Sequence, residues 1–106
     1  MDGSKKEMGE MNKGYIIVRI KRTRQEGWGE YRTAVTKLIS EYGGRYIVQG
    51  GMVELLEGQY DGRQLVILEF PSIDIVRSFW HSAAYADVKA LRDSSGELDA
   101  WAISGV

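Results

Sequence analysis

Hydrophobic residues follow two spacings along this chain, one typical of strands and one typical of helices. Residues 14–22, GYIIVRIKR, are rich in β-branched side chains and predict a strand. Between Glu30 and Tyr42 the spacing becomes helical. The hydrophobic residues there are Tyr31, Val35, Leu38, Ile39 and Tyr42. The pair Gly43–Gly44 ends this helix, because glycine readily adopts the left-handed backbone that follows a helix.

A second group of strands follows the glycine pair. Residues 45–49, RYIVQ, begin a strand that Gly50–Gly51 interrupts and that residues 52–57, MVELLE, resume. The Asp61–Gly62 turn signal then predicts a hairpin between MVELLE and QLVILEF, residues 64–70.

The last third of the chain predicts two short helices and a final strand. Ser72 suits the N-cap of a helix that reaches Trp80, and Ser82 suits the N-cap of a helix over Ala83–Asp93. Residues 98–105, LDAWAISG, supply the final strand. The resulting order, β-α-β-β-α-β, predicts an α+β, ferredoxin-like domain: an antiparallel sheet with its helices on one face.

The strands carry hydrophobic residues on both faces, whereas a sheet covered on one side usually alternates hydrophobic and polar residues. In residues 65–70, LVILEF, and 101–103, WAI, neither face is polar throughout. Two helices cover only one face, and each fully buried large side chain contributes about 1.5–3 kcal/mol. We therefore expect a homodimer in which the sheet faces meet, a dimeric α/β barrel.

Composition places these elements in one domain. The chain has 106 residues, and we assign 14–106 to the domain and 1–13 to a polar, flexible N-terminal tail. The sequence holds no cysteine, which excludes disulfides and cysteine-ligated metal, and which fits a cytoplasmic location. It has no apolar run of the roughly 20 residues that span a bilayer, so we expect no membrane partner.

Nucleic acid is not an expected partner either. The formal net charge is −1, so the chain has no broad basic surface for phosphates. RNA-recognition domains share the β-α-β-β-α-β order, but their third strand carries basic and aromatic residues. Here that strand is the aliphatic RQLVILEF.

Five segments together resemble the DUF1330 family of the dimeric α/β-barrel superfamily. They are NKGYIIVRI, YGGRYIVQGG, LLEG, VILEFPS and FWHSAAYADVKALR. The resemblance implies a ferredoxin-like protomer whose sheet packs on that of its twin. The wider superfamily includes cofactor-free monooxygenases, muconolactone-isomerase-like enzymes and ligand-binding modules, so the fold constrains function weakly.

Two residues are the candidates for catalysis. His81 is the only histidine, and its ordinary pKa suits a proton shuttle near neutral pH; alternatively, it ends a helix and bonds terminal carbonyls. Glu69 shares a strand face with hydrophobic residues, so its carboxylate must find a partner or titrate at higher pH. It is either an acid or base facing a cavity, or the cross-strand ion-pair partner of Arg19.

Residues near the strand and helix ends are the candidates for binding a ligand. Aromatic residues would line an apolar pocket, and polar ones would orient a carbonyl or carboxylate. The candidates are Trp28, Tyr31, Arg45, Tyr46, Glu57, Trp80, Ser82 and Tyr85. A lone histidine without a matching partner spacing gives no metal site, and we expect no cofactor.

Three functions remain open from the sequence. The first is a homodimeric domain that binds a small apolar ligand without chemistry. The second is a cofactor-independent enzyme, monooxygenase- or isomerase-like, acting on a small apolar carbonyl or phenolic metabolite. The third is a structural partner domain without a pocket. The surroundings of His81 separate them, because catalysis needs an enclosed cavity that His81 shares with a carboxylate.

Overall fold

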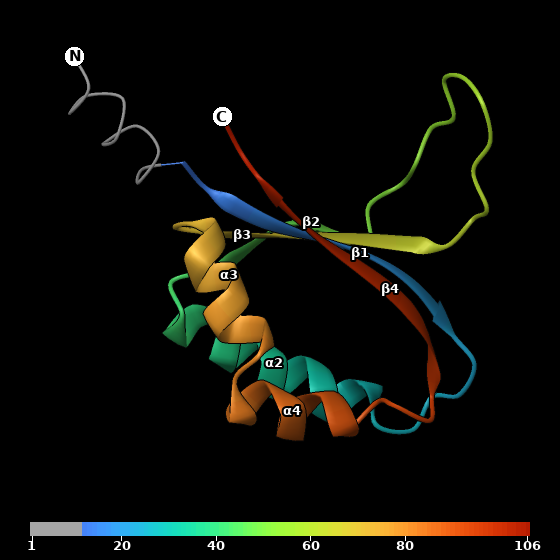
Figure 1. Ribbon diagram of the computed structural model, residues 1–106. Helices are drawn as coiled ribbons and strands as arrows, with labels where there is room; N and C mark the ends of the chain where they lie inside the picture. Colours follow the sequence, from blue (N-terminus) through green and yellow to red (C-terminus); the bar gives the residue numbers. More distant parts are fainter. Residues whose placement is uncertain (1–11) are drawn as a thin grey trace, which may run out of the picture.

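The sheet has four antiparallel strands in the order β2-β3-β1-β4, as the computed structural model of residues 12–106 shows. They are β1 (Gly14–Arg22), β2 (Arg45–Gln49), β3 (Gln64–Phe70) and β4 (Gly96–Ser104). The first strand in the chain therefore lies inside the sheet, between β3 and β4 (Figure 1).

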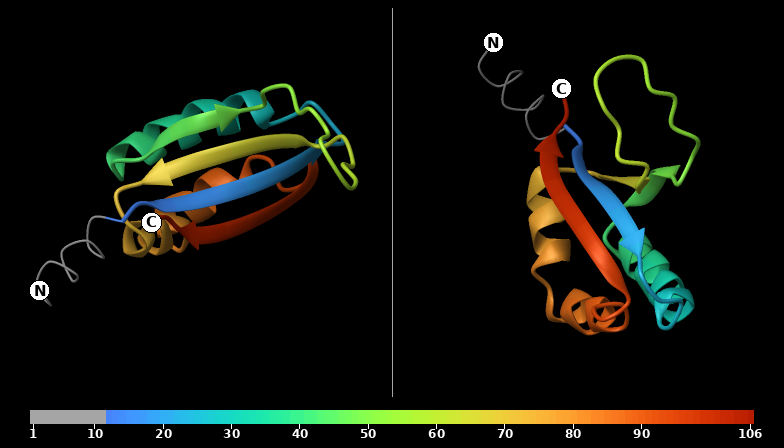
Figure 2. Two further views of the ribbon diagram at one scale, coloured as in Figure 1. Left: turned by 90° about the horizontal axis from the view of Figure 1, so that it is seen from above. Right: turned by 90° about the vertical axis from the view of Figure 1, so that its right-hand side faces the viewer.

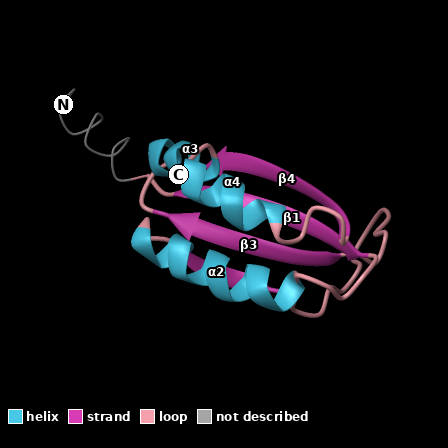
Figure 3. Ribbon diagram, turned by 90° about the horizontal axis from the view of Figure 1, so that it is seen from below, coloured by secondary structure: helices cyan, strands magenta, loops and turns pink. Residues whose placement is uncertain are grey.

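The helices lie together on one face of this sheet (Figure 1 and Figure 3). They are α2 (Trp28–Glu41), α3 (Ile73–Trp80) and α4 (Ala83–Ala90). Ser72 and Ser82 cap α3 and α4 as predicted, because their hydroxyls accept hydrogen bonds from the backbone N–H of Ile75 and Tyr85. The predicted ferredoxin-like β-α-β-β-α-β arrangement is confirmed, with its second helix in two pieces.

Helix α4 ends three residues before the predicted Asp93. The backbone N–H groups of Leu91 and Arg92 donate to carbonyls three residues earlier, at 3.1 Å each. These tighter turns lead the chain into β4.

The core lies between the sheet and the helices. Ile16, Val18 and Ile20 of β1 are buried there, as the two-residue period of a strand requires. Phe79 of α3 packs against Phe70 of β3, with ring centroids 5.0 Å apart. One layer of side chains thus joins helices and sheet, and no helix of residues 12–106 covers the other sheet face.

The predicted hairpin strand at residues 52–57 is wrong. Residues 51–63 form no strand, and they extend as a long loop on the side of the sheet away from the helices (Figure 1 and Figure 2). Gly50 has a left-handed backbone (φ 68°), which turns the chain out of the sheet directly after β2. Met52 and Leu56 are 100% and 88% exposed, so these two side chains pack against little or nothing among residues 12–106.

The predictions of an N-terminal tail and of no membrane partner can be compared with the structure only over residues 12–106. The predicted N-terminal tail lies outside them, apart from Asn12 and Lys13. In residues 12–106, no helix has the length and hydrophobicity to cross a membrane.

Candidate functional site

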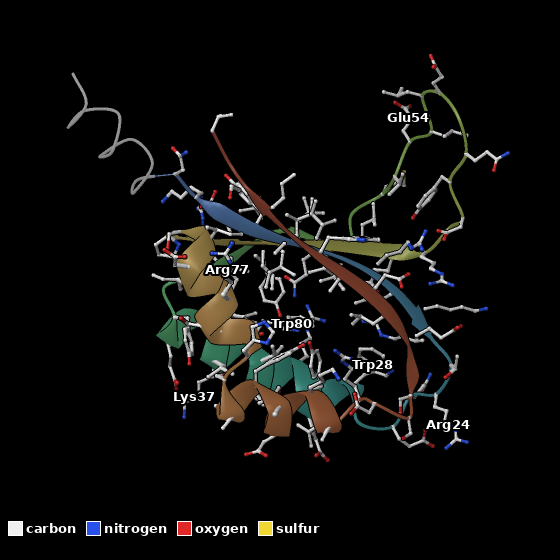
Figure 4. All side chains as sticks on the ribbon, in the orientation of Figure 1. Arg24, Trp28, Lys37, Glu54, Arg77 and Trp80 are labelled. Atoms are coloured by element: carbon white, nitrogen blue, oxygen red, sulfur yellow. The ribbon has the colours of Figure 1, made fainter. Side chains whose placement is uncertain are left out.

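A cleft of about 250 Å³ lies between α2 and the sheet, and we call it the α2 cleft. Its floor is apolar, with side chains from strands β1 and β3, helix α2 and the start of β4. The floor residues are Val18, Ile20, Val35, Ile39, Leu68 and Leu98. Three predicted ligand-binding residues, Trp28, Tyr31 and Tyr46, also line this cleft. Figure 4 shows Trp28 between the helices and the sheet.

The mouth of the α2 cleft is polar and basic. Its polar lining residues are Arg22, Arg32, Gln49 and Gln64, and among residues 12–106 no aspartate or glutamate lines it. The Nη1 group of Arg22 donates a hydrogen bond to Oε1 of Gln64. The same guanidinium lies over the indole ring of Trp28, 5.0 Å from its centroid. This contact is a cation–π interaction that holds Arg22 at the mouth.

A buried polar cluster supports one wall of the cleft. The hydroxyls of Tyr31 and Tyr85 lie 3.2 Å apart, and Nη2 of Arg92 donates to the Tyr85 hydroxyl at 3.2 Å. The guanidinium of Arg92, a residue only 6% exposed, lies 5.2 Å from the centre of the Tyr31 ring. Burial, followed by the neighbouring Tyr85, raises the pKa of Tyr31 far above its ordinary value. Tyr31 is therefore a neutral wall of the cleft, not a base.

Tyr85 is placed differently from the prediction. It is 2% exposed and packs between Phe79 and Trp80, at ring-centroid distances of 4.9 Å each. It supports Tyr31 from within the core and does not line either of the clefts described here.

His81 borders a second cleft of about 210 Å³, which we call the α3 cleft. Trp80, Arg77 and Val76 line it from α3, opposite residues 100–102 of β4. The backbone N–H of His81 donates to the carbonyl of Arg77 at 3.0 Å, so this residue ends α3 as one alternative predicted. No carboxylate from the described part of the chain lines this cleft.

Glu69 lies on the sheet face opposite the helices. A catalytic partner of His81 would instead lie on the helical face, beside the α3 cleft. Its carboxylate accepts hydrogen bonds from Arg45 Nε at 3.0 Å and from the Tyr15 hydroxyl at 3.2 Å. The hydrogen bond from Arg45 is the main cause that lowers the pKa of Glu69; burial opposes it, and Tyr15 assists it. The structure thus does not bring the two predicted catalytic residues into one cavity.

The predicted pair between Arg19 and Glu69 is wrong. The strand register places Tyr15 opposite Glu69 and Leu65 opposite Arg19. Arg19 forms ion pairs with Asp61 at 2.9 Å and with Asp99 at 2.8 Å instead.

The other predicted binding residues are dispersed. The Ser82 hydroxyl donates to the Phe79 carbonyl at 2.8 Å and accepts from the Tyr85 N–H at 3.0 Å. Its hydrogen bonds as donor and as acceptor are therefore both used in capping the helix ends. Glu57 is exposed in the long loop, and Arg45 is exposed beside Glu69. The structure brings together Trp28, Tyr31 and Tyr46, and separately Trp80 and His81.

Sequence reasoning missed the polar mouth of the α2 cleft, although its signal was present. Arg22 has the same strand parity as Val18 and Ile20, so it continues their face at the end of β1. Gln64 likewise continues the helix-facing side of β3. Arg32 follows Trp28 by four residues, which places both on one side of α2.

Residues 12–106 contain no group of three or more histidine, aspartate or glutamate residues placed to hold an ion.

Fold and clefts together define a ferredoxin-like α+β domain with an apolar cleft between its helices and its sheet. The chain belongs to the DUF1330 family, described as a domain of unknown function, whose family model matches residues 13–106. No curated protein among those compared matches it.

Two solved structures are similar to this chain in fold. The RPA0582 protein of unknown function from Rhodopseudomonas palustris is 15% identical, with a TM-score of 0.67 over 97% of this chain and 88% of that one. SnoaB, a cofactor-independent oxygenase from Streptomyces nogalater, is 9% identical, with a TM-score of 0.52 over 90% of this chain and 94% of that one. At these identities the likeness shows the fold alone.

Proposed function

We propose that the protein is a homodimeric domain that binds a small molecule in the α2 cleft. The observation that carries this function is the cleft itself, which has an apolar floor, aromatic walls and a polar mouth. Binding sites for small molecules have this composition, with few polar groups that fix orientation.

The helix-free face of the sheet supports the homodimer. Its middle row, read across the four strands, is Trp101, Ile17, Ile67 and Val48, and is wholly apolar. Polar residues flank this row on both sides, with Glu69 paired to Arg45 on one side and Arg19 paired to Asp99 on the other. An apolar centre within a polar rim is the arrangement of a protein interface, and a second copy presents the same face.

The long loop adds hydrophobic area on the same side of the sheet. It extends away from the helices, and Glu54 lies on it far from the helical layer (Figure 4). Its exposed Met52 and Leu56 lack partners within the described part of the protomer. Packing against a partner subunit would remove these side chains from water.

A cofactor-independent enzyme is the second candidate function. It is supported by the fold shared with SnoaB and by the position of His81 on the α3 cleft beside Trp80. In this alternative His81 would move a proton of a small phenolic or carbonyl substrate bound in the α3 cleft.

The experiment that tests the proposed function blocks the α2 cleft. Gly29 lines it, and a Cβ at this position would meet no atom within 4 Å, so Gly29→Phe adds a ring at the cleft without a clash at the backbone. Gly51→Phe is the matched control, because a Cβ there also meets nothing and the residue lines neither cleft.

A panel of small phenols, carbonyl compounds and carboxylates is screened by thermal shift and by NMR. We expect compounds that bind the wild type to bind Gly51→Phe and to fail on Gly29→Phe. Equal binding to both variants would contradict the α2 cleft as the site. Loss of binding in His81→Ala instead would favour the enzyme alternative in the α3 cleft.

A further inference from the structure

We propose that the ligand of the α2 cleft is a small organic anion, with its apolar body on the cleft floor and its carboxylate held by Arg22 and Arg32. This inference rests on the proposed function, because it names the chemical class of ligand for the same cleft.

The charges around the cleft are the first argument. In the part of the chain that the structure describes, two arginines and no acidic residue line it. In residues 12–106 neither Arg22 nor Arg32 lies within 4.0 Å of a carboxylate oxygen, whereas Arg19, Arg63 and Arg77 each form an ion pair. The nearby Asp61 is already bound by Arg19 and Arg63. Arg22 and Asp61 line the same neighbouring hollow, but among residues 12–106 the two arginines of the cleft form no ion pair, and an anionic ligand would supply one.

The orientation of Arg22 is the second argument. Its Nη1 group is bound by Gln64, and its plane lies over Trp28, so two contacts fix a side chain that is usually mobile at a surface. The Nε and Nη2 groups have no partner among the described residues. A guanidinium presents these two donors side by side, which matches the two oxygens of a carboxylate. Binding to a fixed guanidinium costs less conformational entropy than binding to a free one.

The position of Arg32 adds a second cation to the same mouth. It lies one helical turn after Trp28 on α2 and, like Arg22, lines the cleft. Gln49 completes the polar rim with an amide that donates hydrogen bonds. The rim thus consists of donors suited to oxygen acceptors.

The floor and volume of the cleft define the rest of the ligand. The floor is made of valine, isoleucine and leucine, which favour an apolar body. About 250 Å³ corresponds to the liquid volume of about eight water molecules, and so to a ligand of roughly ten non-hydrogen atoms. An aromatic acid with one ring or a carboxylate with a six-carbon chain has this size.

The test compares matched probes that differ in charge. Isothermal titration calorimetry measures binding of phenylacetate against phenylacetamide, and of hexanoate against hexanamide. We expect at least one carboxylate to bind roughly tenfold or more tightly than its amide, because hydrogen bonds to a charged acceptor are about twice as strong as neutral ones. Raising the salt concentration should reduce this preference.

Variants assign the preference to the two arginines. We expect Arg22→Gln and Arg32→Gln each to weaken the carboxylate about tenfold and to leave the amide unchanged, which also shows that the cleft is intact. Arg24→Gln is the matched control. Arg24 forms no ion pair within the described residues and does not line the α2 cleft, and Figure 4 shows it near the edge of the molecule.

The outcomes separate this inference from the proposed function. If carboxylates and amides bind equally well, the proposal that the ligand is an anion is wrong, and the cleft remains a binding site. If both arginine variants still bind the carboxylate more tightly than the amide, the assignment of the carboxylate to Arg22 and Arg32 is wrong. Failure of both carboxylates to bind would overturn the anion proposal, whereas the proposed function itself is overturned when compounds of the panel bind Gly29→Phe as well as they bind Gly51→Phe.

Discussion

Arg45 donates a 3.0 Å hydrogen bond to Glu69 on the sheet face that no helix covers, and the Tyr15 hydroxyl donates to the other oxygen of the same carboxylate. Each partner comes from a different strand, so this contact joins β1, β2 and β3 at one end of the sheet. The carboxylate that the sequence marked as a candidate acid or base is thus a charged link between strands.

The first prediction concerns the pH dependence that this link produces. Arg45 and Tyr15 lower the pKa of Glu69 in the folded protein. The stabilisation is therefore fully present above the ordinary carboxyl pKa of about 4.3 and is lost as the pH falls through the lower folded value. We expect Glu69→Gln to be less stable than the wild type at pH 7 and to approach it near pH 2.

Urea denaturation at a fixed protein concentration measures this difference. Glu57→Gln is the control, because Glu57 is exposed in the long loop and should leave stability unchanged at both pH values. A deficit in Glu69→Gln of the same size at pH 7 and pH 2 would contradict an ionic role.

The second prediction separates capping from ligand binding at Ser82. Its hydroxyl bonds to Phe79 and Tyr85, at 2.8 and 3.0 Å. Loss of an N-cap typically costs about 1 kcal/mol, so we expect Ser82→Ala to lower the free energy of unfolding by about that amount. Ligand affinity should stay unchanged. Ser82→Asp should restore most of the stability, and a Ser82→Ala variant that keeps full stability but loses ligand would return Ser82 to the binding site.

The fold was predictable wherever one element carries its own signal. The two-residue alternation of β1 and the serine caps of α3 and α4 are local, and the predicted positions agree with the structure. The hairpin at residues 52–57 failed because hydrophobic residues beside the Asp61–Gly62 turn signal suit a strand, whereas no strand in residues 12–106 pairs with this segment. A hydrophobic pattern shows that a segment could be buried. It does not show whether another segment lies close enough to pair with it.

Only part of the candidate site could be predicted, because the rest depends on contacts between segments that are distant in the sequence. Trp28 and Tyr31, aromatic residues that were expected to line an apolar pocket, lie in the wall of the α2 cleft. The mouth depends on where the ends of β1 and β3 meet α2, and that meeting brings Arg22 beside Gln64 across 42 positions of sequence. His81 was a candidate for catalysis as the only histidine, and Glu69 as a carboxylate on an otherwise apolar strand face. Strand parity places Glu69 on the open face, which separates them.

The third prediction uses two glycines at the start of α2. Gly27 has a φ of 84°, and a Cβ there would lie 1.9 Å from the carbonyl oxygen of Leu91. We expect Gly27→Ala to destabilise the protein by at least about 2 kcal/mol, since strain and a backbone clash add.

Gly29 is the matched control for this variant. It lies within α2 and a Cβ there meets no atom within 4 Å. Gly29→Ala should be neutral or stabilising by up to about 1 kcal/mol, because alanine favours the helix. Thermal denaturation of both variants makes the comparison, and equal effects would contradict the close approach of the α2 start to the end of α4.

The fourth prediction concerns the homodimer. Trp101 and Val48 lie at opposite edges of the apolar middle row of the open sheet face, and they are 50% and 37% exposed in the protomer. Because both are already partly in water, a glutamate at either position is compatible with the folded protomer. In a dimer the same glutamate would be buried without a partner charge, which is strongly unfavourable.

We therefore expect the wild type to sediment as a dimer at micromolar concentration, and Trp101→Glu and Val48→Glu each to weaken association by at least about tenfold. Circular dichroism should show that both variants keep their secondary structure. Leu91→Glu is the control, because Leu91 is 38% exposed at the end of α4, on the helical side of the molecule. A wild type that stays monomeric at all concentrations, or a Leu91→Glu variant that dissociates as readily as the other two, would place the interface elsewhere or remove it.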